Sequence, residues 1–310
     1  MQLFSSTLSQ LLFLFTLIAV GFFLAKRNVI PQNSATVLAK LENNLFVPGL
    51  IIGTFVEHFT ISKLQFAAKL LLVCSIIMLI AAVLSVLFSK CVTKDRYTQR
   101  IYTYGLTFSN FGFMGNAVVS ALFPDIFLEY LLFTLPLWFL IYLWGVPSLL
   151  IAKAEGKVTM KERAMNFVNP MFIAMIIGMI LGLSGVQLPS WLLDVINTSG
   201  NCMSPVAMLL TGITVSTISF KKTFTNLSIY AVTLVRLIGF PLLFIAAAHF
   251  IPMDKTTYIC ALCSLAMPLG LNTIVIPSAY GKDTSVAAGM ALISHLLSCV
   301  TIPLMFMFIK

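Results

Sequence analysis

Few residues of this sequence carry a charge. Asp, Glu, Lys and Arg make up 9% of the 310 residues, whereas soluble domains carry about a quarter. Hydrophobic residues make up 59%, and the mean hydropathy is +1.02. This composition excludes a soluble globular protein and predicts an integral membrane protein. A helix needs roughly 20 apolar residues to cross the bilayer, so the chain has room for about ten spans and no sizeable soluble domain.

The common signatures of catalysis and ATP use are also missing. Neither H-E-x-x-H nor a Walker A motif nor a dinucleotide fingerprint occurs. Residues Gly182 to Gly185 match the G-x-S-G of intramembrane serine proteases, but the sequence places no general base to activate Ser184. We therefore expect no enzyme, no cofactor and no ATP-driven transport.

Cysteine is sparse, with six residues scattered along the chain. Cys260 and Cys263 form a C-x-x-C motif, but they lie in an apolar segment without a nearby His or acid. Cysteines in such places usually act as small apolar side chains. We expect no metal site.

Acidic residues are outnumbered, ten against nineteen basic residues, which gives a net charge of +9. A basic chain can bind nucleic acid, but these basic residues form short clusters between apolar runs, as cytoplasmic loops do. We expect no nucleic-acid partner. The apolar runs predict ten spans, at residues 8–25, 38–57, 66–89, 101–122, 126–152, 168–186, 190–217, 226–251, 257–280 and 285–309.

Most basic residues lie in every second connection between these spans. They are Lys26, Arg27, Lys40, Lys90, Lys94, Arg96, Arg100, Lys153, Lys157, Lys161, Arg163, Lys221, Lys222 and Lys282. The positive-inside rule places these connections in the cytoplasm and both termini outside the cell membrane. Because Lys26 and Arg27 follow the first apolar run, we expect an uncleaved first helix.

The two halves of the chain resemble each other. Asn44 to Pro48 reads N-x-x-x-P, and Asn201 to Pro205 repeats it 157 residues later. Similar separations relate Pro31 to Pro189, Asp125 to Asp283 and Pro147 to Pro303. Five spans per half is an odd number, so the halves must cross the membrane in opposite senses. We predict a first repeat at 1–152, a cytoplasmic linker at 153–167 and an inverted second repeat at 168–310.

The fourth and ninth predicted spans contain residues that disrupt helices. TFSNFGFMGNAVVSALFPD, residues 107–125, aligns with CSLAMPLGLNTIVIPSAYGKD, residues 263–283. Unpaired backbone groups at mid-membrane are tolerated where they line a polar cavity or meet another interrupted helix. The N-termini of two half-helices would then favour an anion. The alternative is that these small and amide residues only allow close helix packing. The candidate binding residues are Ser109, Asn110, Gly112, Gly115, Asn116, Pro268, Gly270, Asn272 and Thr273.

Further candidates are polar groups within other spans, which are costly in the membrane unless they have a function. Arg236 could pair with a substrate carboxylate or an internal acid, or extend towards the cytoplasmic surface. Glu42 and His295 could carry a proton, although Glu42 could instead pair with Lys40, and His295 could simply bond a neighbouring helix. The two motif amides, Asn44 and Asn201, complete the candidate substrate-binding set.

The sequence resembles the auxin efflux carrier family of the bile acid/auxin transporter superfamily, in the form of a bacterial member. The resemblance covers almost the whole chain and rests on SNFGFMGN, AMPLGLN with AYGKD, NLFVPGLI, VRLIGFPLL and LLSCVTIPL. It implies ten helices in two inverted five-helix repeats, with the fourth and ninth helices broken and crossing at the substrate site. It also implies a homodimer, a scaffold of the first, second, sixth and seventh helices, and a moving transport domain of the third to fifth and eighth to tenth.

One departure from the family concerns the first broken helix. The family often has Gly-x-Pro where this sequence reads Gly115-Asn116-Ala117. We therefore expect Gly112, Gly115 and Asn116 alone to open this helix.

The resemblance implies a secondary or facilitative transporter of a small organic anion, such as auxin or a short mono- or dicarboxylate, by an elevator-like movement. Two alternatives remain: a membrane sensor that binds its ligand without moving it, and a proton- or sodium-coupled symporter for another solute. Protons, Na⁺ or no coupling ion are all compatible with the sequence.

Overall fold

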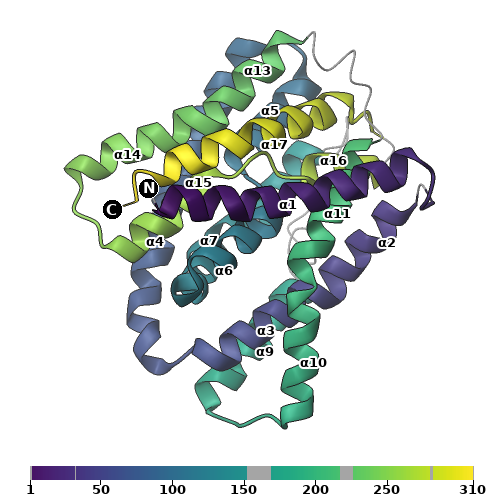
Figure 1. The fold of residues 1–310 in the computed structure, drawn as a ribbon. Coiled ribbons are helices and arrows are strands. Elements are labelled where there is room, and N and C mark those ends of the chain that lie inside the picture. The colour runs from purple at the N-terminus through teal and green to yellow at the C-terminus, as the bar shows by residue number, and fades with distance from the viewer. Residues whose placement is uncertain (1, 32, 152–168, 217–225, 280–281, 310) are drawn as a thin grey trace.

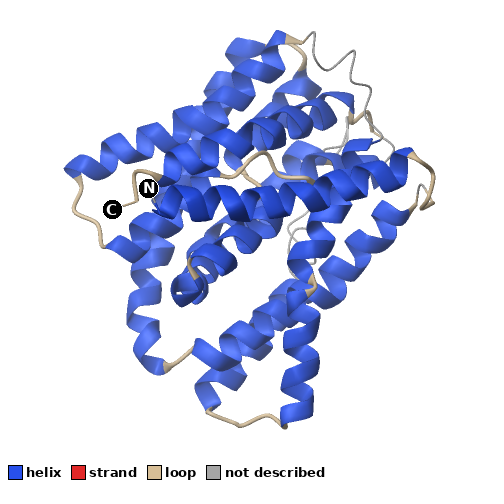
Figure 2. Ribbon diagram, in the orientation of Figure 1, coloured by secondary structure: helices blue, strands red, loops and turns tan. Residues whose placement is uncertain are grey.

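The computed structural model describes residues 2–31, 33–151, 169–216, 226–279 and 282–309, and within these ranges the chain is helical and contains no strand (Figure 1, Figure 2). This confirms an all-helical fold. The elements are α1 (Gln2–Lys26), α2 (Ser34–Leu41), η1 (Glu42–Phe46), α3 (Val47–His58), α4 (Ile61–Val92), α5 (Arg96–Thr107), η2 (Phe111–Gly115), α6 (Asn116–Leu122), η3 (Pro124–Ile126), α7 (Phe127–Leu140), η4 (Ile141–Leu150), α9 (Pro170–Ser184), α10 (Ser190–Asn201), α11 (Met203–Ser216), α13 (Leu227–Leu234), η5 (Val235–Gly239), α14 (Phe240–Phe250), α15 (Lys255–Ala266), α16 (Asn272–Ala279) and α17 (Ser285–Phe306).

Six helices in the described ranges are long and apolar enough to span a membrane. They cover Leu8–Lys26, Ser34–His58, Phe66–Val92, Pro124–Leu150, Leu227–Phe250 and Ser285–Phe306. The other predicted spans are shorter or interrupted: 101–122 divides into α5 and α6, 190–217 into α10 and α11, and 257–280 into α15 and α16. The full count of ten therefore stays a prediction. The predicted linker at 153–167 lies outside the described residues.

The outer surface of the helices is apolar. On α4, side chains at helical spacing are half or more exposed, namely Leu72, Ile76, Leu79, Val83 and Leu87. Such a stripe is unfavourable in water but matches lipid tails. Together with the six apolar helices, it supports a chain that crosses the membrane several times.

Local sequence explains where several helices begin and end. The side chains of Asp95, Asn169 and Asp254 accept hydrogen bonds from backbone amides in the first turns of α5, α9 and α15. Gly185 ends α9 with a φ of 66°, a conformation that glycine adopts without steric cost. The Ser184 hydroxyl donates to the Leu181 carbonyl. The G-x-S-G motif thus has a structural explanation as a helix end.

The proline of the repeated N-x-x-x-P motif coincides with irregular backbone in both halves. Glu42–Phe46 forms a π-helical turn directly before Pro48, and the chain breaks between α10 and α11 at Cys202. Proline lacks an amide hydrogen and so removes a helical hydrogen bond. The regular α-helical hydrogen bonding is therefore interrupted near both prolines.

For description we divide the helix contacts into two groups, although α1 of the first group also packs extensively against α17 of the second (Figure 1). In one group α3 packs against α9 and α10, while α11 packs against α1 and α2. In the other, α4 packs against α5 and α7, α15 against α7 and α14, and α17 against α13. Contacts of α1 with α17 and α6, and of α11 with η2, join the two groups.

Glycine allows the closest of these approaches, between α1 and α11. A Cβ atom on Gly212 would lie 1.9 Å from the Ile18 carbonyl oxygen, and one on Gly21 would lie 2.3 Å from the Leu209 carbonyl oxygen. Because both neighbours are backbone atoms, no larger residue fits here without moving a helix. Small residues at such contacts are typical of membrane helices.

Candidate functional site

Two helix interruptions lie side by side near the centre of the second group. Helix α5 ends at Thr107 and the chain is non-helical at Phe108–Asn110, while α15 ends at Ala266 and the chain is non-helical at Met267–Leu271. The two stretches meet in a single antiparallel bridge between Ser109 and Leu269. We call this meeting of 108–110 and 267–271 the junction.

Hydrogen bonds across the junction satisfy backbone groups that the helix breaks leave open. The backbone amide of Asn110 donates to the Pro268 carbonyl at 2.7 Å, and the Ser109 hydroxyl donates to the Ser264 carbonyl at 2.7 Å. The Leu269 amide donates to the Ser294 hydroxyl of α17 at 3.2 Å. Each partner is protein, so the junction is stable without lipid or water at these groups.

The first break lies upstream of the position expected from the sequence. Gly112 and Gly115 belong to the π-helical turn η2, and Asn116 is the first residue of α6. The expectation that these three residues open the helix was therefore wrong. The break follows Thr107 because backbone pairing with the second segment, at Asn110 and Pro268, replaces the helical hydrogen bonds there.

Arg236 ties the carbonyl ends of both interrupted helices together. Its side chain is 1% exposed. The guanidinium donates to the carbonyl oxygens of Leu106 at 2.9 Å, Ser264 at 3.0 Å and Met267 at 3.4 Å. A cation at two helix C-termini is favourable because both ends carry partial negative charge. Arg236 thus neither extends to the surface nor pairs with an acid, but holds the junction.

The N-terminal ends of the two following helices face one small hollow. Its volume is about 20 Å³, close to that of a single water molecule. It is lined by Tyr104, Phe108, Ser109, Asn110, Phe111, Gly112, Phe113, Trp138, Ile141, Gly270, Leu271 and Asn272. These include Phe111 and Asn272, the first residues of η2 and of α16, so both helix starts adjoin this hollow.

A larger hollow adjoins the first through shared residues Gly112, Phe113, Trp138 and Asn272. Its volume is about 250 Å³. Its remaining lining residues are Asn43, Val47, Tyr142, Asn169, Pro170, Met171 and Ile276. These come from η1, α3, η4, α9 and α16, so both groups of helices form it. We call the two hollows together the junction cavity.

Aromatic packing shapes one wall of the junction cavity. Trp138 stacks on Tyr142 at an interplanar angle of 16° and meets Phe111 edge to face. A Cβ atom on Gly112 would lie 2.6 Å from the Trp138 ring. Glycine at this position therefore leaves the space that the indole occupies.

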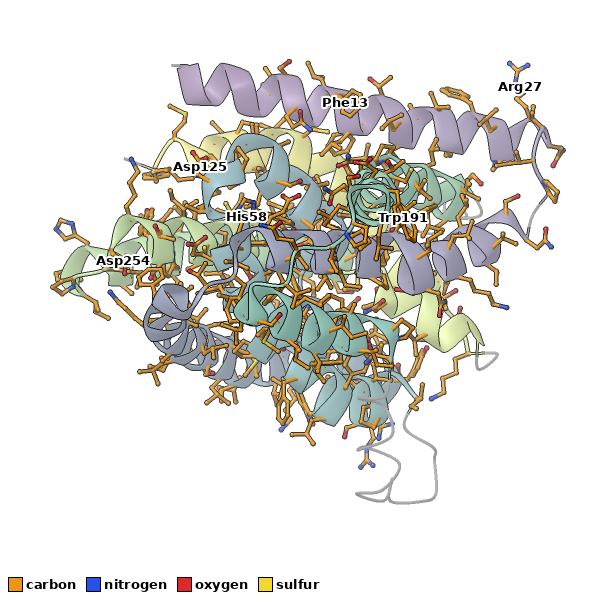
Figure 3. The ribbon with its side chains drawn as sticks, turned by 90° about the horizontal axis from the view of Figure 1, so that it is seen from below. Phe13, Arg27, His58, Asp125, Trp191 and Asp254 are labelled. Carbon is orange, nitrogen blue, oxygen red and sulfur yellow. The ribbon has the colours of Figure 1, made fainter. Side chains whose placement is uncertain are left out.

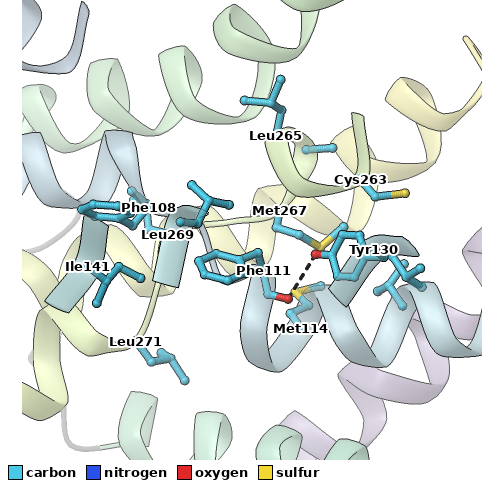
Figure 4. Close-up of a cluster of buried hydrophobic side chains, with 14 of the residues drawn as sticks. Phe108, Phe111, Met114, Tyr130, Ile141, Cys263, Leu265, Met267, Leu269 and Leu271 are labelled. Atoms are coloured by element: carbon cyan, nitrogen blue, oxygen red, sulfur yellow. Dashed lines mark hydrogen bonds between the residues drawn. The ribbon is translucent and has the colours of Figure 1, made fainter. Parts of the chain in front are cut away.

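The wall behind η2 is fixed by Tyr130 (Figure 4). Its hydroxyl donates to the Phe111 carbonyl at 3.1 Å. A Cβ atom on Gly115 would lie 2.2 Å from this hydroxyl oxygen. Gly115 therefore makes room for the tyrosine and does not line the cavity, and this is the packing role considered as an alternative in the sequence.

His295 lies behind Asn110. Its Nε2 is 3.1 Å from Asn110 Nδ2, and its Nδ1 is 2.7 Å from the Ala291 carbonyl oxygen. The imidazole is 3% exposed. His295 therefore contacts a cavity-lining residue without lining the cavity itself.

Of the remaining candidates, some contact the junction and others are buried away from the cavity. Pro268 and Thr273 act within the junction, where the Thr273 hydroxyl donates to the Gly270 carbonyl at 2.8 Å. Asn272 donates weakly to the Tyr104 hydroxyl at 3.4 Å. Asn116 is buried but does not line the cavity.

The structure does not bring the two motif amides to the cavity. Asn44 and Asn201 are both exposed, and Asn44 donates to the Lys40 carbonyl. Glu42 is fully buried, and neither carboxylate oxygen has a hydrogen-bond partner among the described residues. Its chain neighbour Asn43 reaches the cavity instead.

Sequence reasoning missed the cavity residues outside the two interrupted spans. Asn43 stands in the polar stretch of the second span, so it could have been chosen beside Asn44. Asn169 gave no such signal, because its side chain also fits the start of a helix. Trp138 and Tyr142, four residues apart on one helix, resemble ordinary packing residues in a sequence.

A separate hollow of about 550 Å³ lies between the end of α14 and the start of α15. It contains two basic side chains, His249 and Lys255, with Tyr258, Met253 and Phe308. It is larger than the junction cavity, but none of the residues that line it belongs to the junction. Within the described ranges no group of three His, Cys, Asp or Glu residues is placed to hold a metal ion.

Six long apolar helices, an exposed apolar stripe on α4 and a cavity beside two interrupted helices are the features of a multi-pass membrane protein. The family described as "Membrane transport protein" matches the chain twice, over residues 6–166 and 156–306. The chain belongs to this family of membrane transporters, which confirms the resemblance to auxin efflux carriers. No curated protein matches the chain.

Proposed function

We propose that this protein carries a small organic anion across the cell membrane, as a secondary or facilitative transporter, and that the junction cavity binds the anion. The observation that carries the proposal is the convergence of two helix N-termini, at Phe111 and Asn272, on one cavity. Helix starts offer unpaired amides and partial positive charge to an anion. The candidate residues beside them are Ser109, Asn110, Gly112, Gly270 and Asn272.

The cavity suggests the size and shape of the substrate. A volume of about 250 Å³ is just below the usual range for drug-sized ligands, roughly 300–1,000 Å³. Its lining includes three residues with carboxamides, Asn43, Asn169 and Asn272, and three aromatic residues, Phe113, Trp138 and Tyr142. A carboxylate with a short or flat apolar body, such as a short mono- or dicarboxylate or an auxin-like acid, fits this division.

The two groups of helices support an alternating-access mechanism of the elevator type. We propose that α4 to η4 and α13 to α17 move as the transport domain against α1 to α3 and α9 to α11. The cavity lies between the groups, because Asn43, Val47 and Asn169 come from one and Gly112, Trp138 and Asn272 from the other. Movement of one group would therefore open the cavity to either side. Ten helices in two inverted repeats, crossing broken helices, a homodimer and both termini outside complete the proposal.

The first experiment separates a carrier from a sensor that only binds. Purified protein is screened by thermal shift against acetate, malonate, succinate, benzoate and indole-3-acetate, because a ligand of the folded state raises its stability. The best binder is then offered in radiolabelled form to proteoliposomes. We expect saturable uptake. Binding without flux would identify a sensor.

A variant locates this activity at the cavity. Gly112→Val places a Cβ atom 2.6 Å from the Trp138 ring, so the indole at the cavity wall must move. We expect uptake to fall about tenfold or more, since small displacements at a binding site have such effects. Gly239→Ala is the matched control, because the nearest atom to an added Cβ there is 3.6 Å away. Equal uptake by both variants would place the site elsewhere.

A further inference from the structure

The hydrogen bonds of His295 determine its tautomer. Nδ1 faces the Ala291 carbonyl oxygen at 2.7 Å, and since a carbonyl can only accept, Nδ1 carries a hydrogen. In the neutral ring Nε2 then has a lone pair. The Asn110 atom 3.1 Å from Nε2 must therefore be the amide nitrogen, which donates to it.

This pairing also determines what Asn110 offers on its other side. With Nδ2 held by His295, the free branch of the carboxamide is Oδ1, for which the described part of the chain provides no hydrogen-bond partner. Asn110 lines the junction cavity. Beside neutral His295 the side chain therefore presents the Oδ1 acceptor together with one remaining N–H, and the acceptor is unfavourable next to an anion.

A proton on Nε2 reverses this arrangement. Both ring nitrogens of an imidazolium are donors, so Nε2 can then pair only with Asn110 Oδ1. The carboxamide must turn, and its two N–H groups replace Oδ1 on the free branch. The protonated pair thus offers an anion two donors and a nearby positive charge.

We propose that His295 is a positioning residue that controls the carboxamide of Asn110, and that an organic anion binds to the junction cavity together with one proton. The inference rests on the proposed function and adds a proton as the second species of that site. The proton comes from water and is held at Nε2, while the carboxylate keeps its charge. A monoanion and its proton are therefore taken up as a neutral pair.

The surroundings of α17 explain why the proton needs the anion. The elements that pack most against α17 are α1, α5, α11, α13, α15, α16 and η5. Their ionisable residues are Lys26, Arg96, Tyr97, Arg100, Tyr102, Tyr104, Tyr230, Lys255, Tyr258, Cys260, Cys263 and Arg236, with Cys299 on α17 itself.

None of these residues is a carboxylate, and Arg236 is a buried cation. An imidazolium in this place would have no acidic counter-charge on the neighbouring elements. A charged group in the membrane interior is costly when unpaired. The substrate anion supplies the missing charge, so proton and anion stabilise each other's binding, and this coupling must be reciprocal.

Nitrogen NMR of ¹⁵N-histidine tests the pairing directly. The sequence has three histidines, so the double variant His58→Gln, His249→Gln leaves His295 alone to observe. Near neutral pH without anion, we expect the neutral Nδ1–H tautomer. Saturation with the best-binding carboxylate of the thermal-shift panel should convert the signal to imidazolium. An Nε2–H tautomer in the free protein would overturn the inference.

Binding as a function of pH supplies a second test. If one proton accompanies each anion, the apparent Kd of that carboxylate rises by up to about tenfold for each unit of pH at alkaline pH. His295→Gln should abolish this dependence yet retain binding. His249→Gln, at an exposed histidine far along α14, is the control and should keep it.

The outcomes separate the two proposals. Binding of a carboxylate without a change in the His295 signal overturns the proton inference and leaves the anion site intact. Loss of the pH dependence in Glu42→Gln, with its retention in His295→Gln, would assign the proton to Glu42 instead. Failure of every carboxylate to bind would overturn the proposed function together with this inference.

Discussion

At the scale of single residues, Arg236 is the most consequential side chain of the described structure. It is fully enclosed, and its hydrogen bonds go to carbonyl oxygens of Leu106, Ser264 and Met267. These carbonyls terminate two different helices, so one guanidinium satisfies acceptors that neither helix can satisfy alone. The same cation contributes positive charge to the region where we place the anion.

Replacement of Arg236 should therefore destabilise the protein. Arg236→Met leaves buried carbonyl groups without donors, at a cost of about 1–3 kcal/mol for such a loss, and we expect a lower Tm in detergent. Arg236→Lys should have a smaller effect because it retains the charge and some of the donors.

Arg27→Met is the control for this measurement, since Arg27 extends away from the helices at the end of α1 (Figure 3). Its Tm should match that of the wild type. A Tm for Arg236→Met equal to or above the wild-type value would contradict the bracing role of Arg236.

Some of the candidate residues chosen from the sequence line the cavity, and others do not. Asn110, Gly112 and Asn272 were chosen because they disrupt helices, and they do line the cavity. Arg236 was chosen as a deep cation, but its backbone partners are distant in sequence and leave no pattern. Asn44 was chosen because it belongs to a repeated motif, which lies where regular helical hydrogen bonding is interrupted. Such a motif does not specify which face of the helix carries the amide.

At the scale of elements, two features decide the arrangement of the helices: the interruptions that meet at the junction, and the close contact of α1 with α11. The break points depend on pairing between 108–110 and 267–271, which is why composition alone placed the first break too late. Regular apolar runs gave helix positions well, since apolar stretches of helical length are the strongest signal in a membrane sequence. The contact of α1 with α11, however, depends on glycines whose partners only the structure identifies.

The α1–α11 contact yields a stability prediction. Gly212→Ala places a Cβ atom 1.9 Å from the Ile18 carbonyl oxygen. Since backbone must move, we expect a loss of about 1–3 kcal/mol, as for other overpacked sites, and a Tm lower by several degrees.

Gly239→Ala is the comparison, because it adds the same methyl group at an exposed position of η5. We expect little change in Tm, since alanine also favours helix more than glycine does. If Gly212→Ala unfolds at the same temperature as Gly239→Ala, then the helices are not in close contact in the membrane.

At the scale of the whole molecule, membership of the transporter family and the two helix groups both support the proposal that the junction cavity carries a solute across the membrane. The cavity is lined by residues of both groups, so the proposed movement of the groups would change its access, and the two helix starts proposed to bind the anion belong to the group that carries the junction. The two-fold match of the family to residues 6–166 and 156–306 fits a chain made of two related halves.

The most direct test of the central claim is a cryo-EM map of the protein saturated with the carboxylate that it transports. We predict ligand density in the junction cavity, with the carboxylate beside Asn110 and the helix starts at Phe111 and Asn272. Ligand density in the separate hollow of about 550 Å³, beside His249 and Lys255, would contradict the proposed binding site.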